Sequence, residues 1–171
     1  MRLRDADPED VEGIREVARG SLVASYGHAL GDDVIDDAVE RWYDAEGLES
    51  GLPSDDAFLV AEDDGRLVGF AQSYVVERRE RVGEIDWLHV SPSHRGRGVG
   101  TELLGEVESR LREAGVERIE GRVLAANEEG AELSTANGLD SAREATVELG
   151  GDTLAVHRRA KPNQGDAAAS V

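Results

Sequence analysis

Cysteine is absent from this chain of 171 residues. Its absence excludes disulfides, thiolate catalysis and zinc sites of the cysteine type, and it suits a cytoplasmic protein. Long apolar runs are absent as well, because no stretch approaches the roughly 18 residues of a membrane span. The first ten residues, MRLRDADPED, have no apolar core of a secretory signal. We therefore expect a cytoplasmic protein with one core of ordinary size and no membrane partner.

Basic residues are also scarce, and lysine is nearly missing. The chain has 37 acidic and 19 basic residues, a net charge of −18, and Lys161 is its only lysine. A polyanion binder should be basic, so nucleic acid is not an expected partner. The acidity has two interpretations: attraction of a cationic substrate, or adaptation to high salt, where the Debye length falls to about 3 Å at 1 M. The even spread of acidic residues and the lack of lysine favour salt adaptation.

Helical and strand patterns alternate along the chain. Asp7 is expected to cap a first helix that has Pro8 at its first position. Further helices are expected at 33–43, at 98–113 and from Asn127 to near Gly138, and the polar stretch 44–56 is expected as a loop. The expected strands are 2–6, 57–62, 66–76, 84–90, 117–125 and a hairpin, 143–149 with 152–158, around Gly150-Gly151.

This order predicts a mixed α/β fold. Its strands are antiparallel before the central helix, and one β-α-β crossover surrounds that helix. No internal repeat or linker divides the chain, so a single domain is expected over residues 1–159. Residues 160–171, which end in GDAAASV, are expected to form a frayed tail.

A glycine-rich turn, HRGRGVG at 94–100, precedes the central helix. Glycine weakens helices, so three of them at a helix start indicate that something must approach the backbone closely. The free amides of a helix start and the helix dipole favour an anion, here a phosphate or pyrophosphate. The turn does not fit a Walker loop, which needs a following lysine, or a dinucleotide fingerprint, which needs glycine where Thr101 stands. A flexible turn that merely closes the helix is the alternative.

The run Arg95-Gly96-Arg97-Gly98-Val99-Gly100 resembles the R/Q-x-x-G-x-G/A signature of the GCN5-related N-acetyltransferases, the GNAT family. The resemblance extends through WLHVSPSHRGRGVGTELL, Asn127 and Gly138-Leu139, and the order of elements is similar over residues 1–159. It implies the GNAT fold: a mixed, mostly antiparallel central sheet with helices on both faces and a β-α-β core that binds acetyl-CoA. It also implies transfer of the acetyl group to a primary amine by direct attack in a ternary complex, without a metal.

The resemblance assigns the cofactor contacts. Backbone amides from Arg97 to Thr101, which include Gly98, Val99 and Gly100, should meet the pyrophosphate, with Arg95 and Gly96 in the same loop. The peptide groups of Leu88 and Val90 should pair with the pantetheine arm as an added strand would, and Asn127 should lie beside that arm. Two alternatives stay open: Asn127 as a simple helix cap, and both loop arginines as solvated surface charges.

Acetyl transfer requires a neutral amine, so a base must remove a proton directly or through water. By its offset from the glycine loop, the resemblance gives this role to Glu84. A surface carboxylate is the alternative for Glu84, and Asp86 and His89 are weaker candidates for the base. Ideal alternation places Glu84 and Asp86 on the same face as Leu88 and Val90, whereas a bulge in this strand would break that register.

The chain departs from the family at the residue that acts as general acid. Many members carry a tyrosine seven residues after the Asn, where it protonates the departing thiolate, but Ser134 stands here. Serine is a poor acid, although it can hold a water or contact the sulfur. The aromatic residue that usually follows the glycine is Leu139. The thiolate therefore leaves unassisted, or Tyr26 or Tyr74 reaches the site from elsewhere.

The acceptor has no recognisable signature. A small-molecule amine, a peptide α-amine and a protein lysine all remain open, and so does a homodimer. A second class of function is a non-catalytic module that binds acyl-CoA. The missing tyrosine at position 134 favours that class slightly, whereas Glu84 favours the enzyme.

Overall fold

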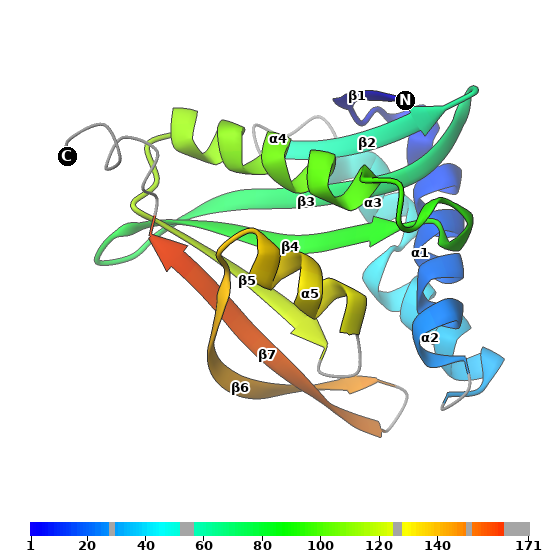
Figure 1. Ribbon diagram of the computed structural model, residues 1–171. Helices are drawn as coiled ribbons and strands as arrows, with labels where there is room; N and C mark the ends of the chain where they lie inside the picture. The colour runs from blue at the N-terminus through cyan, green and yellow to red at the C-terminus, as the bar shows by residue number, and fades with distance from the viewer. Residues whose placement is uncertain (28–29, 52–56, 125–127, 150–151, 163–171) are drawn as a thin grey trace.

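The computed structural model describes residues 1–27, 30–51, 57–124, 128–149 and 152–162 of the chain (Figure 1). The strands are β1 (Arg2–Asp5), β2 (Ala57–Asp63), β3 (Arg66–Glu77), β4 (Arg81–Val90), β5 (Arg118–Leu124), β6 (Asp140–Leu149) and β7 (Asp152–Pro162). The α-helices are α1 (Val11–Tyr26), α2 (Asp32–Trp42), α3 (Ala45–Gly51), α4 (Val99–Glu113) and α5 (Glu128–Ala136). Short 3₁₀ turns at Pro8–Asp10 and Pro92–His94 precede α1 and α4.

All seven strands form one sheet in the order β1-β2-β3-β4-β5-β7-β6. Every neighbouring pair is antiparallel except β4 and β5, which are parallel and are connected through α4. A parallel pair needs such a crossover because the chain must return to the same end of the sheet. The expected mixed, mostly antiparallel sheet with one β-α-β unit is therefore confirmed.

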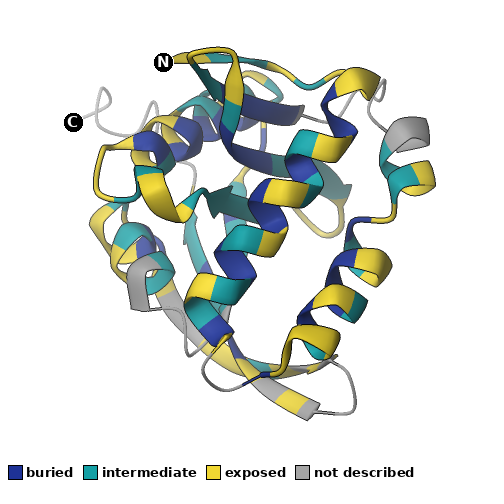
Figure 2. Cartoon of the chain, turned by 90° about the vertical axis from the view of Figure 1, so that its right-hand side faces the viewer, coloured by how far each residue is buried: buried dark blue, intermediate teal, exposed yellow. Residues whose placement is uncertain are grey.

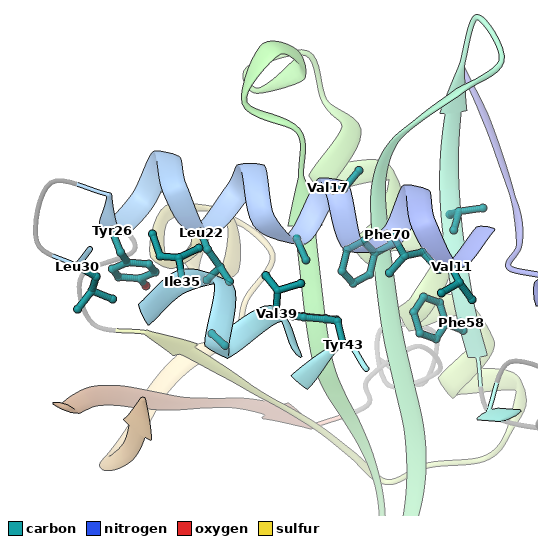
Figure 3. Packing of buried hydrophobic residues seen from close by; sticks show 14 residues of the cluster. Val11, Val17, Leu22, Tyr26, Leu30, Ile35, Val39, Tyr43, Phe58 and Phe70 are labelled. Atoms are coloured by element: carbon teal, nitrogen blue, oxygen red, sulfur yellow. The ribbon is translucent and has the colours of Figure 1, made fainter. Parts of the chain in front are cut away.

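Helices cover both faces of the sheet. The inward faces of α1 and α2 pack with Phe58, Val60 and Phe70 on one side (Figures 2 and 3). On the other side, α4 packs over a second cluster that includes Leu59 and Ala61. Residues 58 to 61 of β2 thus alternate between the two clusters, as the twofold period of a strand requires.

The start of α1 is held by carboxylates. Asp7 accepts a hydrogen bond from the backbone of Glu9 (2.8 Å), and Asp10 accepts one from the backbone of Asp7 (2.9 Å). These bonds form a capping box around the 3₁₀ turn that leads into α1, as the Asp7-Pro8 signal predicts. Arg4 on β1 clamps Asp10 with two hydrogen bonds of 2.7 and 2.9 Å, so the first strand and the first helix are tied together.

Several expected boundaries differ from the structure: β4 and β6 each begin three residues earlier than expected, and two other segments have a different structure. Residues Ala45–Gly51, expected as a loop, form α3, and Leu48 of this helix packs against the α1/α2 cluster. Strand β7 continues to Pro162, so residues 160–162 belong to the sheet and not to a tail. Lys161 explains this extension, because its Nζ pairs with buried Glu108 on α4 (2.6 Å) and donates to the carbonyl of Asn137 (2.7 Å). The rest of the expected tail, 163–171, lies outside the described residues.

Candidate active site

Strands β4 and β5 pair along only half of their length. Val82–Ile85 pair with Arg118–Gly121, and the two strands diverge beyond Ile85 and Gly121 (Figure 1). The second half of β4, residues 86–90, has β3 as its strand neighbour on one side only within the described part of the chain. Peptide groups on its other edge are therefore not used in the sheet, and they are available to a ligand.

A cavity of about 360 Å³ lies at this divergence. Residues 85–89 of β4 and 121–123 of β5 line its two sides, and Leu133 and Ser134 of α5 line it as well. The remaining lining residues come from α1, α2, α4, β6 and β7, so elements on both faces of the sheet contribute to the cavity. Its lining residues range from Leu22 to Arg159 along the chain, so no short sequence motif describes it.

The glycine loop leads into α4 at one side of the divergence. Gly96 and Gly98 have φ of 76° and 83°, a left-handed conformation that strains any residue with a side chain. A Cβ added at either position would meet nothing within 4 Å. Gly98 is the N-cap of α4 and makes no side-chain cap hydrogen bond, so the first amides of the helix remain available to an anion.

The other loop residues divide into packed and exposed ones. Gly100 has a different reason to be glycine, because an added Cβ would lie 3.0 Å from Leu133 of α5. Val99, the first residue of α4, is buried in the core, whereas Arg97 and Thr101 are exposed. Arg97 and Thr101, together with the free space at Gly96 and Gly98, leave the outer side of the loop accessible to a ligand.

Arg95 turns away from the loop toward α1. Its Nη2 donates to Ser21 Oγ (3.1 Å), to the Ser21 carbonyl (3.3 Å) and to Ser25 Oγ (3.4 Å). The side chain therefore anchors the loop to a helix more than seventy residues earlier in the sequence. Arg95, which the resemblance places in the cofactor-binding loop, therefore has a structural role.

A β-bulge at Asp86 determines the face of the sheet on which each side chain of β4 lies. The register passes from Ser73↔Ile85 to Gln72↔Trp87, so Asp86 is the extra residue. Ile85, Leu88 and Val90 consequently all pack beneath α4, whereas Trp87 packs against the α1/α2 cluster. The ideal alternation that placed Glu84 on one face with Leu88 and Val90 is wrong, and the bulge is the reason.

Glu84 belongs to a network of charges rather than to the cavity lining. Its carboxylate accepts a hydrogen bond from Arg78 (2.7 Å) and lies 3.9 Å from Arg158. Glu120 stands directly across from it on β5 and also pairs with Arg78, Arg158 and Arg118. Two carboxylates opposite one another repel, so these arginines stabilise the parallel pairing of β4 with β5.

Asp86, by contrast, lines the cavity. It accepts a hydrogen bond from Arg122 of β5 (2.8 Å). Burial, followed by the charges of Asp86 and Glu84, raises the pKa of Tyr74 to about 12. Tyr74 is therefore protonated at neutral pH, and it is not a lining residue of the cavity.

His89 is held on both ring nitrogens. Nε2 lies 2.8 Å from the hydroxyl of Tyr43, and Nδ1 lies 2.9 Å from Ser21 Oγ. Burial, with the charge of Arg95 as a smaller cause, lowers the pKa of His89 to about 4. The imidazole is thus neutral at physiological pH and is a hydrogen-bonded packing residue, which disfavours it as the base.

The candidates for the acid lie in different places. Ser134 is 8% exposed and lines the cavity, and so does Leu139. Tyr26 lies in the α1/α2 cluster (Figure 3), where burial raises the pKa of its hydroxyl to about 12. Tyr26 is not among the lining residues, so it does not replace the missing phenol. Asn127 lies outside the described residues.

The lining residues that the sequence did not indicate include Trp42, Trp87 and Arg159. Trp42 of α2 and Trp87 of β4 form a tilted aromatic pair with ring centroids 5.4 Å apart. Arg159 of β7 is 8% exposed and donates from Nη1 to Thr135 Oγ1 (2.9 Å) and to the carbonyl of Leu139 (3.0 Å). No local motif marks any of them, because each reaches the cavity through the packing of distant elements.

Among the described residues, no group of three His, Asp or Glu side chains is placed to hold a metal ion. Likewise, no helix in the described ranges is long and apolar enough to cross a membrane.

Residues 17–133 match the family model described as "Acetyltransferase (GNAT) family". Among curated proteins, a mycothiol acetyltransferase of Propionibacterium freudenreichii is 33% identical over 132 residues, which are 75% of this chain and 39% of the relative. An uncharacterized N-acetyltransferase of Archaeoglobus fulgidus is 34% identical over 110 residues, 61% of this chain and 69% of the relative. A spermidine N(1)-acetyltransferase of Thermoplasma acidophilum is 26% identical over 121 residues, 68% of this chain and 73% of the relative. The chain spans well under half the length of the mycothiol acetyltransferases it matches.

Solved structures share the fold. The PaiA N-acetyltransferase of Thermoplasma acidophilum, solved in complex with coenzyme A, superposes with a TM-score of 0.78 at 23% identity. The match covers 94% of this chain and 98% of that one. A GCN5-related N-acetyltransferase from Rhodopseudomonas palustris superposes with a TM-score of 0.76 at 24% identity and covers 94% of each chain.

Proposed function

The chain belongs to the GNAT family of acetyltransferases, and on that premise we propose that it transfers the acetyl group of acetyl-CoA to an amine nitrogen. The observation that carries this proposal is the position of the glycine loop. Two left-handed glycines and the uncapped start of α4 adjoin the divergence of β4 and β5, where the cavity lies. An anion site next to an open strand edge and a cavity suits a long thioester with a pyrophosphate.

The residues present fit acetyl-CoA. We propose that backbone amides from Arg97 to Thr101 bind the pyrophosphate, which the open space at Gly96 and Gly98 supports. Along β4, the free peptide edge at Leu88 and Val90 pairs with the pantetheine arm in the manner of an added strand. Asn127 beside that arm remains a proposal from the resemblance alone. Arg97, exposed on the loop, adds positive charge, whereas Arg95 acts by anchoring the loop to α1.

The amine attacks the thioester directly while both substrates are bound. Its nitrogen forms a bond to the acetyl carbon, the carbon–sulfur bond breaks with its electron pair going to sulfur, and the nitrogen releases one proton. We propose Asp86 as the first acceptor of that proton because it lines the cavity. Glu84, the position that the resemblance indicates, is the second candidate, and its ion pairs with Arg78 and Arg158 support a role in holding β4 against β5.

We propose that the acceptor is a small-molecule amine. The lining residues Trp42, Trp87, Asp86 and Glu148 support this proposal, because aromatic faces and carboxylates attract cations. The match to a spermidine N(1)-acetyltransferase points in the same direction. Peptide and protein amines are the alternatives that a panel of acceptors must include.

We further propose that the protein acts in a cytoplasm of high salt and that nucleic acid is not one of its partners. The support is the net charge of −18, the single lysine and the absence of cysteine.

Two measurements test the function. Calorimetry with coenzyme A should show binding, and incubation of acetyl-CoA with a panel of polyamines, amino acids and peptides should release free thiol in the presence of an accepted amine. No binding of coenzyme A would contradict the proposal outright. Binding without thiol release for any amine would favour the alternative, a module that binds acyl-CoA without catalysis.

A further inference from the structure

Arg159 is a buried cation in the wall of the cavity. It is 8% exposed, and it reaches the cavity from β7 beneath the C-terminal end of α5. One terminal nitrogen, Nη1, is used by Thr135 Oγ1 and by the carbonyl of Leu139. Within the described residues, Nε is buried without a hydrogen-bond partner and Nη2 donates no hydrogen bond. Three of the five N–H donors of this guanidinium therefore have no partner among the described residues.

The other charges of the cavity do not neutralise Arg159. Arg122 also lines the cavity, but Asp86 pairs with it at 2.8 Å. In the part of the chain that the structure describes, Arg159 has no carboxylate within ion-pair distance. His89 is neutral at physiological pH, because burial lowers its pKa to about 4. Glu148, the other lining carboxylate, lies opposite Thr153 of β7, six positions from Arg159. Arg159 therefore has no carboxylate partner among the described residues.

A buried charge without a partner destabilises the fold unless an anion compensates it. The protein could have closed this end of α5 with a neutral donor, since Thr135 and Leu139 require only hydrogen bonds. A guanidinium at this position is explained by an anion that is present only when the cavity is occupied. The ligand must then carry, or acquire, negative charge near α5.

We propose that Arg159 stabilises the thiolate that leaves acetyl-CoA. The inference rests on the proposed function, in which Ser134 contacts the sulfur. Thr135, the next residue of α5, binds Nη1 of the guanidinium at 2.9 Å, and both Arg159 and Ser134 line the cavity, so the guanidinium lies at the α5 end of the cavity. The hydroxyl of serine is too weak an acid to protonate a thiolate. A fixed positive charge instead lowers the free energy of the thiolate itself.

The electron and proton balance needs no acid. When the carbon–sulfur bond breaks, its electron pair remains on sulfur as an anion beside Arg159, and the proton of the amine leaves separately toward Asp86. Coenzyme A then departs as a thiolate or takes a proton from water. Arg159 donates hydrogen bonds throughout and stays protonated, because a guanidinium does not release its proton in proteins.

The test measures the thiol of bound coenzyme A and not turnover. A nearby cation lowers the thiol pKa in the complex, so the affinity for coenzyme A should rise with pH until the free thiol also ionises. The expected rise is about tenfold for each unit by which the bound pKa is lowered. Calorimetry is run from neutral pH to a pH above the thiol pKa of free coenzyme A. Desulfo-coenzyme A, which lacks the thiol, is the reference ligand and should show no rise.

Variants separate charge from packing. Arg159→Gln should remove the rise with pH, whereas Arg159→Lys, which keeps the charge, should retain most of it. If Arg159→Gln does not fold, the lysine variant and the two ligands still decide the question. Arg158→Gln is the matched control, because Arg158 precedes Arg159 on β7 but pairs with Glu84 and Glu120 outside the cavity lining. Its thiol pKa in the complex should equal that of the wild type.

The proposal is overturned if wild-type affinity for coenzyme A has the same pH dependence as that for desulfo-coenzyme A. It is also overturned if Arg159→Gln keeps the rise. If Arg159→Gln loses affinity only for succinyl-CoA or malonyl-CoA, Arg159 binds a carboxylate on the acyl group instead. Failure to bind coenzyme A at all would contradict the proposed function, which distinguishes that failure from the failure of this inference.

Discussion

At the scale of single residues, two carboxylates of β4 lie two positions apart and have different surroundings. Asp86 is the bulged residue and lines the cavity, whereas Glu84 is engaged by Arg78 and Arg158 next to Glu120. A base must come within hydrogen-bond reach of the nitrogen, directly or through one water. Geometry therefore ranks Asp86 before Glu84.

Asp86→Asn should lower kcat by about 10²–10⁴-fold, the usual range for a general base, with little change in the affinity for coenzyme A. Glu84→Gln should lower kcat less and should lower the melting temperature more, because the arginines between β4 and β5 lose one anion. The measurements are pH profiles of thiol release and thermal unfolding of both variants. The reverse order of the two effects on kcat would make Glu84 the base.

The glycines of α4 and its loop differ in backbone conformation, which gives a second prediction. Gly98→Ala forces a side chain into a φ of 83°, which costs about 1–2 kcal/mol. Relief of this strain moves the amides at the start of α4, so the affinity for coenzyme A should fall at least tenfold while the protein remains folded.

Gly105→Ala is the control on the same helix. Gly105 has nothing within 4 Å of an added Cβ and no positive φ, so alanine there should stabilise the helix by about 0.5–1 kcal/mol and leave the affinity unchanged. Calorimetry and thermal unfolding check both variants. Unchanged affinity in folded Gly98→Ala would mean that the loop amides do not hold the pyrophosphate.

At the scale of secondary-structure elements, the start of α1 depends on Asp10. Its carboxylate joins Arg4 of β1 to the capping box, and the hydrogen bonds from Arg4 hold the pKa of Asp10 below its usual value. The stabilisation is therefore complete above the pKa of an unfolded aspartate, about 3.9, and it is lost as pH falls toward the lower pKa of the folded state.

Asp10→Asn should lower the free energy of unfolding at neutral pH by about 1.5–3 kcal/mol, the range for hydrogen bonds to charged groups. Urea unfolding at neutral and acid pH measures this change, and the difference from the wild type should shrink in acid. Asp7→Ala, which removes the exposed cap, should cost only about 1 kcal/mol. An Asp10→Asn variant as stable as the wild type at neutral pH would show that β1 and α1 are joined by other contacts.

At the scale of the whole molecule, the net charge of −18 on 171 residues governs stability. Carboxylates in such excess repel one another at low ionic strength, and salt screens this repulsion to within a few ångströms at molar concentration. The melting temperature should therefore rise steeply with KCl from tens of millimolar to molar. Acetyl-CoA should still bind in molar salt, because oriented amides at a concave loop are screened less than exposed side chains.

Thermal unfolding across a KCl series, with and without acetyl-CoA, measures both effects. A variant with glutamine at Glu16, Glu113 and Glu132, all exposed, carries three fewer negative charges and should show a flatter dependence. A melting temperature that does not change with salt would leave attraction of a cationic acceptor as the explanation of the acidity.

The sequence by itself determined the features that depend on neighbouring residues. RGRGVG before an amphipathic helix indicates an anion site because glycine conformation and helix-start amides are local properties. Asp7-Pro8 likewise predicts the start of the first helix, and the order of periodic segments predicts the mixed sheet. The expectation that polar residues 44–56 form a loop is wrong for Ala45–Gly51, because α3 is stabilised by packing of Leu48 on the α1/α2 cluster and not by its own pattern. Residues 52–56 lie outside the described residues.

Only the tertiary structure decided which side chains meet in the cavity. The bulge at Asp86 arises from the register of β4 against β3, and it reverses the faces that ideal alternation assigns. Arg95 contacts Ser21, seventy-four positions away, and Arg159 reaches α5 from the last strand. Such contacts depend on how strands pair and helices pack across the whole chain. The residues that neighbour Asp86, Arg95 or Arg159 in the sequence therefore do not indicate them.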